Sequence, residues 1–83
     1  MNVMPNNKNI NINKYLEYAR DLAIEKFGQK VYSVIPLGIE TFNLVPEYSK
    51  IEFKVFLKDY EELYLNLFLK GRKITGYDFV YKD

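Results

Sequence analysis

Hydrophobic and polar residues alternate along the second half of the chain. Between residues 50 and 58 every second residue is large and apolar, and from residue 63 to residue 69 leucine holds every second position. A period of two is typical of β-strands that bury one face. The pattern therefore predicts two antiparallel strands that meet at a turn near residues 59–61, followed by a third strand over residues 73–82.

The length of that turn decides which residues of the first two strands face each other. A loop of three residues, 59–61, sets Leu57 opposite Leu63 and gives one continuous apolar face. The same loop sets Lys58 opposite Glu62, which is an opposite-charge pair at the turn. A loop of two residues would set leucines opposite lysines. We therefore expect the three-residue loop.

Residues 60–70 also carry helix signals. Asp59 followed three residues later by Glu62 resembles a helix start, and the apolar residues beyond it have helical as well as strand spacing. A helix here would turn Leu65 and Leu69 outward and leave the preceding strand without a partner. The strand interpretation is therefore favoured over the helix.

The last strand can pair in two registers. After a two-residue turn at 71–72, its aromatic residues lie on the same side as Phe56, Tyr64 and Phe68, whereas a three-residue turn puts them on the leucine side. Exposed aromatic surface on a small protein usually marks a contact with a partner. We predict a protein-binding aromatic face, with the candidate residues Phe56, Tyr64, Phe68, Tyr77, Phe79 and Tyr81.

Upstream of these strands the period changes to that of a helix. Over residues 13–27 apolar side chains fall on one face and charged ones on the other. Asn11 or Asn13 can cap the start, and Gly28 is suited to end the helix in a left-handed conformation. Residues 1–11 are rich in asparagine and carry too little apolar surface to offset their ordering entropy, so a flexible arm is expected.

The segment between the helix and the sheet is less regular. Residues 30–35 predict a short strand that ends at Pro36 or lies at a sheet edge, because proline lacks a backbone donor. Residues 41–45 form either another short strand or a crossing loop whose Phe42 and Leu44 close one end of the core.

Together these elements predict an α+β domain over residues 12–83, with one N-terminal helix packed on an antiparallel meander of three or four strands. This order of elements over residues 13–82 resembles small cystatin-like or PepSY-like units, in which a curled sheet wraps one helix. The resemblance implies a fold and no function. The predicted core contains Leu16, Ala19, Ala23, Phe27, Val31, Ile51, Phe53, Val55, Leu65 and Leu67.

The composition argues against several kinds of binding and catalysis for this chain. The net charge is +1, so no strong field attracts nucleic acid or anionic lipid. The chain has no cysteine and no histidine, which removes thiolate chemistry and the commonest general base and metal ligand. Asp78 lies among aromatic residues, where burial would make it a candidate acid or base. An outward aspartate that discourages edge pairing is the simpler interpretation.

The predicted function is a small non-catalytic protein-binding module. We expect no enzymatic activity, no cofactor, no metal, no nucleic-acid or membrane partner, and a cytoplasmic location. The partner is another protein or a second copy of the chain, and the size suits an inhibitor or adaptor from a phage or mobile element. Two alternatives are a self-associating structural subunit and a curled sheet that binds a small ligand near Tyr32, Phe42 and Tyr77.

Overall fold

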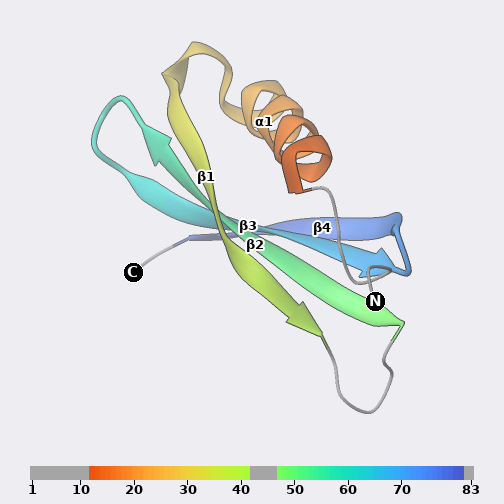
Figure 1. Cartoon of the computed structure of the whole chain (residues 1–83). Coiled ribbons are helices and arrows are strands. Elements are labelled where there is room, and N and C mark those ends of the chain that lie inside the picture. Colours follow the sequence, from red (N-terminus) through yellow and green to blue (C-terminus); the bar gives the residue numbers. More distant parts are fainter. Residues whose placement is uncertain (1–11, 42–46, 82–83) are drawn as a thin grey trace.

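The structure is a computed structural model that describes residues 12–41 and 47–81, with the backbone alone at residues 40 and 41. One helix packs on a four-stranded antiparallel sheet, which confirms the predicted α+β class (Figure 1). The sheet holds its strands in chain order. The elements are α1 (Ile12–Phe27), the 3-10 turn η2 (Gly28–Lys30), β1 (Val31–Thr41), β2 (Tyr48–Leu57), β3 (Glu62–Lys70) and β4 (Lys73–Tyr81).

The helix follows its predicted apolar stripe. Its buried residues are Tyr15, Ala19, Leu22 and Ala23, and Gly28 at its end has a φ of +64°, in the left-handed region that glycine adopts at low cost. The hydroxyl of Tyr15 donates a hydrogen bond to the carbonyl oxygen of Arg72, 2.6 Å away. This bond ties the first turn of α1 to the turn between β3 and β4.

The sheet buries one face against the helix. We call this the helix face and the opposite side the outer face. Residues 62–70 form β3 and not a helix, and the four leucines at alternate positions of β3 are buried on the helix face with the apolar residues of β2. Of the ten predicted core residues, seven are buried; the others, Leu16, Phe27 and Val31, are half-buried against the core.

The β2–β3 turn has the predicted length and a different position. The N–H of Leu57 donates to the carbonyl of Glu61 at 2.8 Å, and the N–H of Tyr60 donates to the carbonyl of Leu57 at 3.0 Å. The loop residues are therefore 58–60. Tyr60 has a φ of 69°, the left-handed conformation that closes a three-residue hairpin loop.

Moving the loop by one residue shifts the pairing by two. Val55 faces Leu63 and Phe53 faces Leu65, so the predicted pairing of Leu57 with Leu63, and that of residues 58 and 62, is wrong. The apolar face is unchanged, because a shift of two residues keeps every side chain on its side of the sheet.

A bulge in β4 combines the two predicted registers. Lys70 faces Lys73 across a two-residue turn and Leu69 faces Ile74, but Phe68 faces Gly76, so Thr75 is an extra residue. Beyond the bulge, the side chains of β4 exchange faces. Each predicted register is therefore correct for one part of the strand.

The edge strand β1 is longer than predicted. It continues through Pro36 to Thr41, in line with the expectation that a proline-containing strand lies at a sheet edge. Tyr32 and Leu37 are extra residues at two irregularities of its pairing with β2. The predictions for residues 1–11 and for Phe42 and Leu44 lie outside the described residues.

Candidate protein-binding site

The six predicted site residues do not share one surface. Phe56, Tyr64 and Phe68 alternate with the buried positions of β2 and β3 and so lie on the outer face. The aromatic residues of β4 oppose the leucines of β3 and so lie on the helix face: Tyr77, Phe79 and Tyr81. The bulge at Thr75 is the physical cause of this separation.

On the outer face, the aromatic residues are half-buried and surrounded by polar contacts. Lys54 pairs with Glu62 at 2.8 Å, and its ammonium lies 5.2 Å from the ring centroid of Phe56. The hydrogen bond to Glu62 raises the pKa of Lys54 above its ordinary value. The outer face is therefore a mixed surface and not one exposed apolar patch.

Asn66 and Asp78 form a second polar contact on the outer face. The side-chain amide of Asn66 donates to a carboxylate oxygen of Asp78 at 3.0 Å. Asp78 itself is exposed, which agrees with an outward aspartate on an edge strand. Its carboxylate lies on the surface of β4 and not in an apolar pocket.

On the helix face, Phe79 belongs to the margin of the core. Its ring meets that of Phe27 edge to face, with centroids 5.7 Å apart, and the ammonium of Lys26 lies 5.4 Å from its centroid. Tyr77 packs beside Phe79 at 6.0 Å between centroids. Phe79 therefore has an evident structural role.

The two most exposed tyrosines lie elsewhere, at the end of the sheet where β1 begins beside the β2–β3 turn (Figure 1). Tyr32 is 75% exposed and Tyr60 is 95% exposed. Together with Phe56 they line a groove of about 730 Å³ at the outer face, here called the outer groove. Within the described part of the chain, neither hydroxyl has a hydrogen-bond partner and neither ring an aromatic neighbour.

Both tyrosines stand at irregular points of the backbone. Tyr32 is the extra residue of a bulge, a feature that commonly re-aims a side chain. Tyr60 has a positive φ, which costs a residue other than glycine roughly 1–2 kcal/mol. Bulges and strained backbone are both found more often than average near functional sites. Their occurrence at two neighbouring tyrosines marks this end of the sheet as the candidate site.

Several bonds hold the turn that carries Tyr60. The N–H of Lys58 donates to the carbonyl of Lys30 at 2.7 Å, and the Lys30 ammonium lies 3.4 Å from the Asp59 carboxylate. The N–H of Glu61 also donates to Asp59. This N–H, together with Lys30, holds the pKa of Asp59 below its ordinary value. These bonds fix the backbone of the turn and so the position of Tyr60; the surface formed by Tyr32 and Tyr60 is called the tyrosine surface below.

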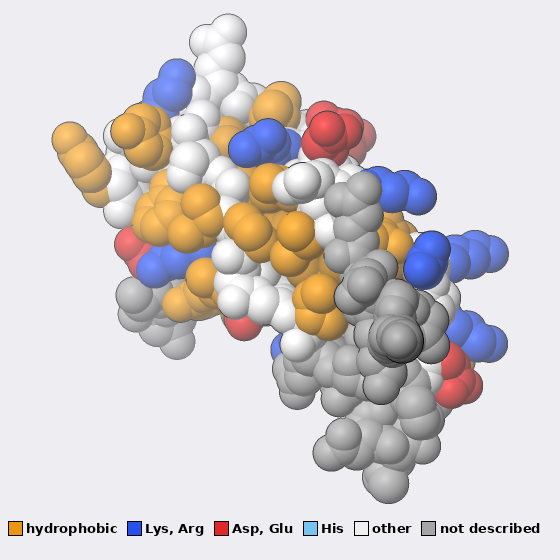
Figure 2. Space-filling model, viewed as in Figure 1, with side chains coloured by type: hydrophobic (Ala, Val, Ile, Leu, Met, Phe, Trp, Pro, Cys, Tyr) orange, Lys and Arg blue, Asp and Glu red, His pale blue; other side chains and the backbone are white. Residues whose placement is uncertain are grey.

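Three further hydrophobic residues of β1 are exposed, but they do not all lie on one face of the sheet. Ile35, Leu37 and Ile39 are each more than two-fifths exposed. Figure 2 shows exposed hydrophobic side chains in several groups, with charged side chains among them. Ile35 faces Lys54 and so lies on the outer face, whereas Ile39 faces Ile51 and lies on the helix face, because the bulge at Leu37 stands between them. Ile35 therefore shares the outer face with the outer groove, and an exposed apolar residue there is typical of a protein contact surface.

The described residues also bear on metal binding, on membrane spans and on the predicted ligand pocket. In the described ranges no group of three or more acidic side chains could hold a metal ion, and α1 is too short and too polar to cross a membrane. Tyr32 and Tyr77 lie on opposite edge strands, β1 and β4. The described tyrosines of the predicted ligand pocket are therefore far apart in the sheet order.

Sequence reasoning missed Tyr60 as a site residue and weighed Tyr32 only for a ligand pocket. One signal was available: a bulky residue at the third position of a three-residue hairpin loop, where glycine is preferred. This signal could be used only if the loop was placed at residues 58–60, whereas the predicted loop was at residues 59–61.

Comparison of the chain with protein-family models, curated proteins and solved structures gives no match. The cystatin-like or PepSY-like resemblance stays a prediction.

Proposed function

We propose that the protein is a small non-catalytic binding module whose contact surface for a protein partner centres on Tyr32 and Tyr60. The observation that carries this proposal is the placement of two largely exposed tyrosines beside one groove, both at irregular points of the backbone. An inhibitor or adaptor role would need no chemistry beyond such a surface. The cytoplasmic location remains a prediction from the sequence.

Tyrosine suits this role for a physical reason. It offers a large rigid contact area at low entropy cost, together with a hydroxyl that can hydrogen-bond across an interface. Tyrosine anchors are among the residues whose truncation most weakens binding. Ile35, which is exposed on the outer face opposite Lys54, would extend the contact along β1.

Photocrosslinking in the source cell tests the proposal. Tyr60 or Tyr32 is replaced by p-benzoylphenylalanine, and Tyr77, an exposed tyrosine of the opposite edge strand, serves as the matched control. We expect a covalent protein adduct from positions 32 and 60 and none from position 77. The proposal is wrong if neither position gives an adduct, or if position 77 gives the same adduct with equal yield.

A further inference from the structure

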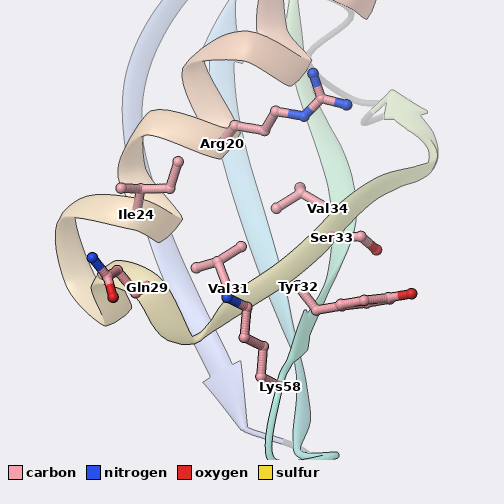
Figure 3. A pocket seen from close by; sticks show the side chains of 9 residues that line it. Arg20, Ile24, Gln29, Val31, Tyr32, Ser33, Val34 and Lys58 are labelled. Atoms are coloured by element: carbon pink, nitrogen blue, oxygen red, sulfur yellow. The ribbon is translucent and has the colours of Figure 1, made fainter.

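A second groove lies on the other side of Tyr32, between the last turns of α1 and the start of β1 (Figure 3). We call it the helix-side groove; its volume is about 460 Å³. Ile24, Val31 and Val34 supply its apolar lining. Its size and lining suit one buried anchor side chain from a binding partner.

Two cations stand at opposite ends of this groove. Figure 3 shows Arg20 on the helix at one end and Lys58 at the other, reaching toward Val31. Within the described ranges neither cation forms an ion pair, whereas Lys30 and Lys54 do. The described lining includes no acidic residue. The groove therefore favours an occupant that carries negative charge.

The β2–β3 turn of the same chain has the complementary chemistry. Tyr60 projects from the turn between Asp59 and Glu61. Asp59 pairs with Lys30, while Glu61 has no ion-pair partner among the described residues. The turn thus presents an aromatic anchor next to a carboxylate without a counter-charge.

Tyr60 does not occupy the helix-side groove of its own chain. It lines the outer groove, on the other side of Tyr32. The turn is held in this position by the hydrogen bond from Lys58 to the Lys30 carbonyl and by the two bonds between residues 57, 60 and 61. An occupant with this chemistry must therefore come from another molecule.

We propose that Tyr60 of a second copy fills the helix-side groove, with its Glu61 facing Arg20, and that the contact is reciprocal. The groove and the turn lie at the same end of the sheet, since Lys58 belongs to both. A single two-fold axis can then seat both tyrosines at once, as in an isologous dimer. This inference rests on the proposed function, because it names the partner of the same tyrosine surface.

The backbone at Tyr60 supports an anchor role. A glycine at this loop position would relieve the positive φ, so the tyrosine side chain is present at a cost to the folded monomer. Burial of that side chain in a neighbouring molecule would offset this cost.

Light scattering on the full chain across a dilution series, from about 1 mM to about 1 µM, tests the inference. We expect a dimer that dissociates within the series. Arg20→Glu and Glu61→Arg should each weaken it by about tenfold or more, because each places like charges across the contact. The double variant Arg20→Glu/Glu61→Arg should recover the dimer, because both charge pairs are rebuilt. Lys14→Glu, an equal charge change on the exposed surface of α1, is the control and should have no effect.

Three results would overturn the inference. They are a monomer throughout the series, a dimer indifferent to both single variants, and a double variant no better than the singles. The proposed function fails separately. A monomer that crosslinks through position 60 to a different protein would reject the reciprocal dimer and retain the binding surface.

Discussion

Phe27, the last residue of the helix, and Phe79, in the last strand, meet edge to face with their planes at 88°. The contact joins two parts of the chain that are distant in sequence. It exists because the bulge at Thr75 turns Phe79 onto the helix face. Without this extra residue, Phe79 would lie on the outer face and the end of α1 would lose its aromatic neighbour.

A double-mutant cycle measures this contact. We expect Phe27→Leu and Phe79→Leu each to lower the free energy of unfolding, with a coupling energy of about 1 kcal/mol, the usual value for an edge-to-face pair. Urea denaturation of the two single variants and the double variant gives the coupling. Strict additivity would mean that the rings do not interact in solution.

Tyr60→Gly should stabilise the fold. Glycine accepts the positive φ at this position without the steric cost that tyrosine has. Glycine also makes the unfolded chain more flexible, which favours unfolding and cancels part of this gain. We expect a net gain of about 1 kcal/mol in the free energy of unfolding. The matched control is Tyr32→Gly, which replaces another largely exposed tyrosine where φ is not positive, and it should give no gain. A destabilised Tyr60→Gly would show that the side chain supports the turn.

Two phenylalanines on β2 should respond very differently to truncation. Phe53 is fully buried on the helix face, and Phe56 is half-buried on the outer face. Phe53→Ala should cost about 3–5 kcal/mol, enough to unfold much of a domain of this size. Phe56→Ala should cost about 1 kcal/mol. Circular dichroism melting compares the two, and similar losses would mean that something covers the outer face.

Asp59 should titrate at a lower pH than an ordinary aspartate, whose pKa is 3.8. The charged form is favoured in the folded state, so its contribution to stability is present above pH 3.8 and is lost as the pH falls through the lowered pKa. NMR titration of the carboxyl carbon measures the midpoint. Lys30→Ala should recover part of the shift and leave the part that the N–H of Glu61, the first cause, produces. A full return to the ordinary value would assign the effect to Lys30.

The apolar face of the sheet was predictable because a pairing error of two residues leaves every side chain on the same face. The predicted pairing of β2 with β3 was displaced by two residues, yet Phe53 and Leu65 still lay on the helix face. The position of the turn was harder to predict, since three-residue loops at 58–60 and at 59–61 both keep the same residues on each face. The hydrogen bond from Lys58 to the distant carbonyl of Lys30 favours the observed loop.

The candidate site was less predictable than the fold. Its tyrosines depend on a bulge at Tyr32 and on the loop position of Tyr60, and both are backbone irregularities. The bulge at Thr75 was also missed: Ile74 and Tyr77 are three positions apart, yet both oppose buried leucines in the structure. A strictly alternating strand cannot place both on one face, so neither of the two bulge-free registers expected from the sequence fits the whole strand.

The irregular backbone of β1 has a consequence for the behaviour of the protein at high concentration. Fibril growth draws on six or seven consecutive strand residues at an exposed edge. The irregularities at Tyr32 and Leu37 divide β1 into regular runs of four residues, 33–36 and 38–41, and Pro36 removes a donor from the first. The strand therefore keeps isoleucine and leucine on its surface without offering a template for amyloid.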